Sequence, residues 1–147
     1  MGHKKKAKRP ELPRKMSALL RLAVKDAQAV EKSKKYVLNM GTWHSPSGNR
    51  CHVCLAGSVM AKSLGSSPDK ELDPYDLPAR TRDALLAVND MREGDFAGAA
   101  RTLRLKDDHR AIAAASALVD FDNGNDDMAQ SWQHYLDAAD VLERFGL

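Results

Sequence analysis

The stretch CHVCLAGSVMAKSLG, residues 51–65, decides the fold because it is apolar on almost every side of a helix. Its large apolar side chains are those of Val53, Leu55, Val59, Met60 and Leu64. A helix that is hydrophobic all round lies buried at the centre of a domain. We therefore expect a central helix that starts near Cys51 and ends at Gly65, with Gly57 allowing a neighbouring element to approach closely.

The chain before this stretch predicts one helix and one extended segment. The apolar residues at 16, 19, 20, 23, 27 and 30 recur at three- and four-residue steps, which is typical of an amphipathic helix reaching about residue 34. Its other side carries Arg21, Lys25, Gln28 and Lys32, which indicates an ordinary solvated face. The segment YVLNMGTWH, residues 36–44, is rich in aromatic and β-branched residues and predicts a short strand, for which the sequence shows no obvious pairing partner.

The chain after Pro78 predicts four helices separated by glycine- and aspartate-rich turns. Gly94 can end the first, Asp95 can cap the second, and Asp107 or Asp108 can cap the third. The third helix is expected to bury Ile112, Ala115, Leu118 and Val119, and the last helix runs over about 128–145. The segment MREGDFAGAA, residues 91–100, resembles the turn of a tetratricopeptide-type helical hairpin. It occurs once, so it predicts antiparallel packing of two helices and not a repeat array.

These elements predict a mainly α fold. At 147 residues the expectation is a single compact domain, residues 16–147, of five or six helices with one short extended segment. A flexible basic arm, residues 1–15, precedes it. No apolar run is long enough to cross a bilayer, and no hydrophobic segment follows the basic N-terminus, so we expect no membrane contact and a cytoplasmic location.

The charges are unevenly distributed, although the net formal charge is only +3. Residues 1–15 carry +6, which leaves −3 on the rest of the chain. The basic residues of the arm are Lys4, Lys5, Lys6, Lys8, Arg9, Arg14 and Lys15. Such an arm can attract RNA, DNA or an acidic protein surface, because each neutralised phosphate releases counterions. The alternative interpretation is a solvated tail that only aids solubility.

The only group of residues that suggests site chemistry lies in TWHSPSGNRCHVCLAG, residues 42–57. Cys51 and Cys54 have the C-x-x-C spacing of metal ligands, and His44 and His52 are close in sequence, so zinc is the cofactor that these residue types would suit. The second half of a usual zinc signature is missing. His52 would point away from a site made by the two thiolates, and His109 or His134 would have to replace it.

Two other interpretations of the same stretch remain open. Cys51 at a helix N-terminus could be an activated nucleophile with His44 as its base, although no residue is placed to orient the histidine. In the second interpretation Cys54 is simply a small core residue, Trp43 packs over the start of the helix, and SPSGN is a turn. This second interpretation leaves both histidines on the surface or in the turn.

The block YVLNMGTWHSPSGNRCHVCLAGSVMAKSLG, followed by ALLAVNDMREGD, resembles small bacteriophage and prophage proteins that have no assigned activity. In them an aromatic–His segment, a glycine turn and a C-x-V-C-L-A-G helix occur together. The similarity covers about residues 36–95. It implies a phage-borne protein in the cytoplasm of a bacterial host, and it implies nothing about catalysis.

The sequence therefore predicts a non-enzymatic interaction protein that binds a host or phage macromolecule. The basic arm would contact nucleic acid or an acidic partner. The alternative is a zinc- or thiol-dependent protein centred on Cys51, Cys54 and His44.

Overall fold

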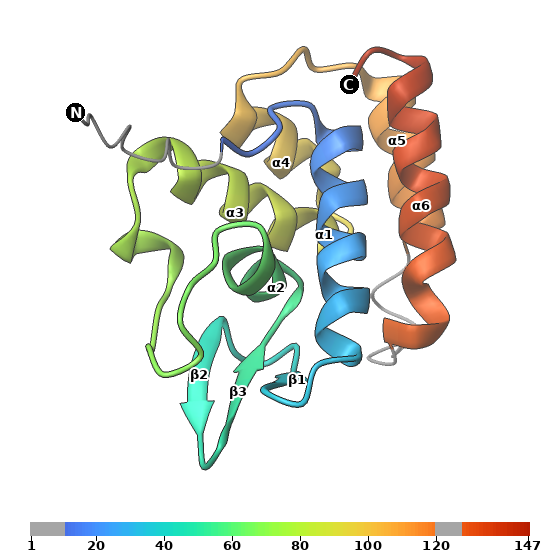
Figure 1. Cartoon of the computed structure of the whole chain (residues 1–147). Helices are drawn as coiled ribbons and strands as arrows, with labels where there is room; N and C mark the ends of the chain where they lie inside the picture. The colour runs from blue at the N-terminus through green and yellow to red at the C-terminus, as the bar shows by residue number, and fades with distance from the viewer. Residues whose placement is uncertain (1–10, 120–127) are drawn as a thin grey trace, which may run out of the picture.

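The computed structural model describes residues 11–119 and 128–147 (Figure 1). The described helices are α1 (Met16–Glu31), α2 (Leu55–Lys62), α3 (Ala79–Arg92), α4 (Phe96–Leu103), α5 (His109–Leu118) and α6 (Met128–Arg144), with a short 3-10 helix η1 (Pro74–Asp76). The described strands are β1 (Tyr36–Leu38), β2 (His44–Ser47) and β3 (Arg50–Val53). The mainly α single domain that the sequence predicts is therefore confirmed. Within the described ranges, no helix is both long and apolar enough to cross a membrane.

Helix α1 stands in the middle of the molecule. Figure 1 shows α6 and α5 on one side of it, α2, α3 and α4 on the other, and the sheet at the end where α1 finishes. The backbone N–H of Ser17 donates to the carbonyl oxygen of Leu147 at 3.1 Å, so the end of the described chain closes on the first turn of α1.

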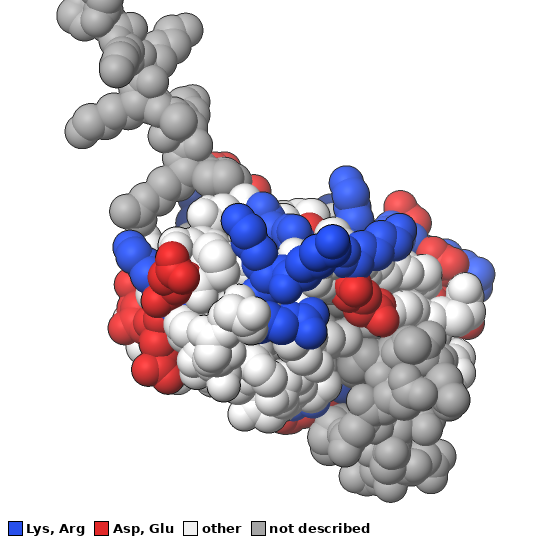
Figure 2. Space-filling model, turned by 60° about the horizontal axis from the view of Figure 1, so that its bottom comes forward, with Lys and Arg blue, Asp and Glu red and all other residues white. Residues whose placement is uncertain are grey.

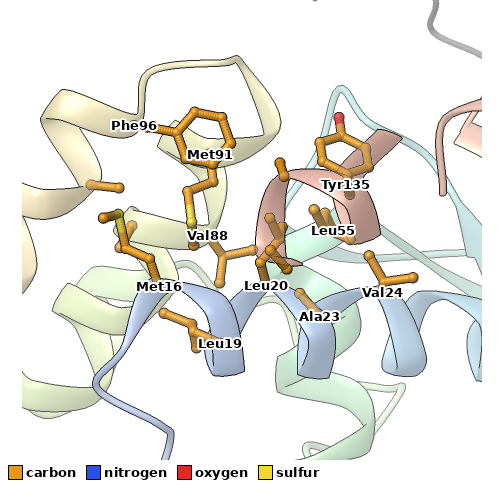
Figure 3. Packing of buried hydrophobic residues seen from close by; sticks show 14 of the residues in the cluster. Met16, Leu19, Leu20, Ala23, Val24, Leu55, Val88, Met91, Phe96 and Tyr135 are labelled. Carbon is orange, nitrogen blue, oxygen red and sulfur yellow. The ribbon is translucent and has the colours of Figure 1, made fainter. Parts of the chain in front are cut away.

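The main core forms where the apolar sides of the six described helices, α1 to α6, meet (Figure 3). Leu20 and Val24 of α1 lie among Leu55 of α2, Val88 of α3 and Tyr135 of α6. Each fully buried side chain of this size contributes about 1.5–3 kcal/mol relative to exposure. The apolar stripe predicted for α1 is thus the face that packs.

The central buried helix is confirmed as α2, in which every residue from Leu55 to Ala61 is buried. Gly57 lies against the backbone of Trp43, and a Cβ at this position would overlap the Trp43 carbonyl oxygen. The close approach that the sequence predicts at Gly57 is therefore present, and a larger residue cannot fit without moving the segment that precedes β2.

The start of this helix differs from the expectation. Residues 50–53 form strand β3, so α2 begins at Leu55 instead of near Cys51. The sheet has the order β1-β3-β2, in which β1 pairs with β3 in parallel and β2 pairs with β3 antiparallel around a turn at Gly48. The pairing partner of the predicted strand is β3, which lies mostly within the apolar stretch 51–65. The sequence does not reveal this pairing, because local sequence does not specify the register of strands that are distant in the chain.

The structure tests the predicted helix caps and the predicted buried face of α5. The Asp95 carboxylate accepts from Gly98 N–H at 2.8 Å and caps α4, and Asp108, not Asp107, caps α5. Helices α3 and α4 pack against each other after the turn at Gly94. Of the face predicted for α5, Ala115 and the C-cap residue Val119 are buried, whereas Leu118 is exposed, because the buried positions recur every four residues from Ala111.

Candidate functional site

Cys51 and His44 are the two predicted site residues that the fold brings together. Cys51 points to the buried side of β3, and its Sγ lies 3.6 Å from Nδ1 and 3.9 Å from Nε2 of His44. Since these two distances are nearly equal, the sulfur cannot lie along the lone pair of either nitrogen. Burial raises the pKa of the Cys51 thiol, and the nearby charge of Asp69 raises it further. The pair therefore has neither the geometry nor the thiolate character of an activated nucleophile.

His44 is buried, which corrects the expectation that it lies on the surface or in a turn. Its Nδ1 lies 2.7 Å from the carbonyl oxygen of Lys70, and because a carbonyl only accepts, this nitrogen carries a hydrogen and donates. The His44 carbonyl oxygen accepts from Leu72 N–H at 2.9 Å. His44 therefore joins β2 to the segment at 70–72.

Cys54 and His52 do not belong to the pair formed by Cys51 and His44. Cys54 caps α2, where its Sγ accepts from Gly57 N–H at 3.3 Å, and burial raises the pKa of its thiol. His52 faces the opposite side of β3 from Cys51, with Nδ1 3.2 Å from the Asn39 amide nitrogen.

The remaining two histidines of the zinc hypothesis, His109 and His134, are exposed on α5 and α6. In ranges 11–119 and 128–147, no three or more His, Cys, Asp or Glu residues are grouped so that they could hold a metal ion.

A second candidate site lies where α1 ends and the sheet begins. Figure 2 shows lysine and arginine side chains gathered in the middle of this side of the molecule. We call this surface the basic face. Its exposed residues are Lys25, Lys32, Lys34, Lys35, Arg50 and Lys62.

Tyr36 at the start of β1 holds the basic face together. Arg50 Nη2 donates to the Tyr36 carbonyl oxygen at 2.7 Å, and Lys62 Nζ lies 5.5 Å from the centre of the Tyr36 ring. The Tyr36 hydroxyl donates to the carbonyl oxygen of Ser66 at 3.1 Å. The Cys51 N–H donates to the Lys35 carbonyl oxygen at 2.8 Å, so the α1–β1 connection is fixed beside Arg50. Strand pairing and the position of α2 therefore bring together basic residues that are up to 37 positions apart in sequence.

In the described part of the chain, the carboxylates near the basic face do not form ion pairs with its lysine and arginine side chains. The Asp26 carboxyl is buried, burial raises its pKa, and the Ser63 hydroxyl donates to it. Glu31 accepts from Trp132 Nε1 at 2.8 Å, and Asp69 lies near Tyr36. Among the residues that the structure describes, none of these carboxylates forms an ion pair with the six basic side chains.

From the sequence alone, Lys25 and Lys32 are expected only to belong to a solvated helix face, and the basic face is not predicted. Lys34 and Lys35 follow them directly, which is a local signal, but the contributions of Arg50 and Lys62 depend on strand pairing and on the end of α2.

Only the last part of the predicted arm, residues 11–15, lies within the described residues. Arg14 and Lys15 are exposed just before α1, at the opposite end of a 16-residue helix that is about 24 Å long. Lys4, Lys5, Lys6, Lys8 and Arg9 lie outside the described residues.

Comparison of the chain with protein-family models, with curated proteins and with solved structures found no match in any of the three.

Proposed function

We propose that this is a non-enzymatic interaction protein that binds nucleic acid, with the basic face contacting phosphates and the basic N-terminal arm adding attraction. The observation that carries the proposal is the gathering of six exposed basic side chains that have no ion-pair partner among the described residues. Basic side chains that form no ion pair within their own chain can neutralise phosphates and release the counterions that those phosphates hold.

The state of the cysteines supports binding over catalysis. Burial raises the pKa of both thiols, so near pH 7 they are protonated and poorly nucleophilic. Cys54 also uses its sulfur to cap α2. The resemblance to phage and prophage proteins leads us to propose a bacterial host cell as the setting, with host or phage nucleic acid as the ligand.

Fluorescence anisotropy of a labelled DNA duplex, titrated with the full chain over a series of salt concentrations, tests this proposal. The variant K32Q/K34Q/K35Q removes three charges from the exposed α1–β1 connection and is expected to weaken binding about tenfold at low salt. It should also reduce the slope of log K against log salt by about 1 per side chain.

A matched control, R101Q/K106Q/R110Q, removes three exposed charges from α4, α5 and the connection between them, and it should bind nearly as the unchanged protein does. If the full chain fails to bind DNA and RNA at low salt, or if both variants lose affinity equally, the proposal is wrong.

The arm has its own test. Removal of residues 1–10 takes away five basic residues and should weaken binding and flatten its salt dependence further. If affinity and slope stay unchanged, the arm has no part in the interaction.

The alternative is a zinc- or thiol-dependent protein, and the observation in its favour is the contact between Cys51 and His44. Elemental analysis of protein purified without chelator would support it if zinc is stoichiometric and is lost in Cys51→Ser. Slow thiol labelling of the folded protein, with no bound zinc, would instead agree with two buried structural thiols.

A further inference from the structure

We infer that the basic face binds the backbone of a nucleic-acid duplex without reading its base sequence. This inference rests on the proposed nucleic-acid binding and names the kind of ligand and the mode of contact.

The basic face offers no aromatic surface on which unpaired bases could stack. Its aromatic residue, Tyr36, is only 6% exposed, lies beneath Lys62, and uses its hydroxyl in a hydrogen bond to Ser66. The most exposed aromatic residue of the described ranges, Tyr75, lies on η1 with the Arg82 guanidinium 5.9 Å from its ring centre. Proteins that hold single strands obtain much of their affinity from stacking of bases on aromatic side chains. The basic face lacks that contribution.

Three polar side chains beside the basic face that could contact base edges, those of Arg50, Asn39 and Ser33, are already engaged in hydrogen bonds. One terminal nitrogen of Arg50 is held by the Tyr36 carbonyl, which opposes a two-pronged contact to guanine. The Asn39 side chain bonds to His52 and to the Gly41 N–H. Ser33 Oγ accepts from the Lys35 N–H. Five of the six basic residues are lysines, whose compact ammonium groups suit phosphate contacts that carry no sequence information.

A broad group of ammonium charges favours a duplex over a single strand. A duplex presents about one negative charge per 1.7 Å of its axis, counting both strands, so several lysines can find phosphates at once. A single strand has a lower charge density and releases fewer counterions per contact. Since stacking cannot compensate here, the duplex should bind more tightly.

The test uses the full chain with two unrelated DNA duplexes of about 20 base pairs and with their separate strands, at matched low salt. We expect the two duplexes to bind with dissociation constants within about twofold of each other, and each separate strand to bind about tenfold more weakly. In K32Q/K34Q/K35Q the preference for duplex should shrink, whereas R101Q/K106Q/R110Q should keep it.

The possible outcomes distinguish failure of duplex-backbone recognition from failure of nucleic-acid binding as such. Equal or tighter binding of single strands, or a tenfold preference for one duplex sequence, overturns duplex-backbone recognition while nucleic-acid binding stands. A duplex preference that is unchanged in K32Q/K34Q/K35Q overturns its assignment to the basic face. Absence of binding to every nucleic acid overturns both.

Discussion

The helical core and the sheet end of this protein bury their side chains in different ways. The helical core joins α1 to α6 through a large, nearly all-apolar cluster that includes Cys54. The sheet end, which we define as residues 32–53, contributes to a separate small cluster of Val30, Tyr36, Cys51, Val53 and Ala61. Beside this cluster lie the buried His44 and, on the outside, most of the basic face. The helices therefore bury most of the apolar side chains that stabilise the fold, whereas the sheet end arranges the surface that we propose to bind a ligand.

We expect the largest loss of stability from a substitution at Gly57, at the junction where α2 of the helical core contacts the segment before β2. In Gly57→Ala the new methyl group overlaps the backbone oxygen of Trp43, so either α2 or the segment before β2 must move. We expect the free energy of unfolding in urea to fall by about 4 kcal/mol. Gly41→Ala is the control, because a Cβ there meets only the Asn39 side chain, and it should cost less than about 1 kcal/mol. Similar losses in both variants would contradict this view of the junction.

The second prediction compares the two clusters directly. Leu20→Ala in the helical core and Val53→Ala in the sheet end both empty fully buried positions. We expect losses of about 3 and about 2 kcal/mol in the free energy of unfolding, because the leucine removes more apolar volume. Val53→Ala should also weaken DNA binding through the displaced sheet, whereas Leu20→Ala should leave the affinity of the folded protein unchanged. The reverse pattern would show that the basic face is held by the helical core.

The two cysteines sharpen the comparison further. Cys54→Ser keeps an oxygen that can accept from Gly57 N–H and cap α2, so we expect a loss of about 1 kcal/mol or less. Cys51→Ser places a hydroxyl in the small apolar cluster against the His44 ring, for a loss of about 2 kcal/mol. Urea unfolding of the two variants side by side measures the difference. A larger loss in Cys54→Ser would mean that its sulfur matters for packing and not for the cap.

The sequence predicts these two regions unequally well, and the reason is physical. The helices of the core can be predicted from local sequence patterns. These patterns are the helical spacing of apolar residues, as at Leu19, Leu20 and Ala23, and capping residues such as Asp95. The strands at the sheet end depend on pairing between Tyr36 and Cys51, 15 positions apart, which no local pattern specifies. The apolar run from 51 to 65 therefore predicted one helix where the chain forms a strand, a cap and a shorter helix. The sequence does not predict the basic face for a related reason, since Arg50 reaches it through strand pairing and Lys62 through the position of the end of α2.

The smallest expected effect concerns the helical core alone. Burial, together with the charges of Asp95 and Glu93, raises the pKa of Asp90 from its usual 3.8 to about 6. The folded state thus binds this proton more tightly than the unfolded state does. The contribution of Asp90 to stability is fully present below pH 3.8 and is lost as the pH rises through 6.

Asp90→Asn should therefore raise the free energy of unfolding at pH 7 by about 1 kcal/mol, a figure reduced to allow for solvent screening of a partly exposed group. It should have no stabilising effect below pH 4, and it should leave DNA binding unchanged. Urea unfolding of both proteins across this pH range measures the effect. Equal stabilisation at every pH would show that the cause is not the charge of Asp90.

The central claim is that the sheet end binds the ligand while the helical core carries the fold. A titration of isotopically labelled full chain with a DNA duplex, followed by backbone amide chemical shifts, tests it most directly. We expect the largest shifts at residues 32–36, Arg50 and Lys62, with little change along α4 and α5. Shifts concentrated on α4 and α5, with residues 32–36 unaffected, would contradict it.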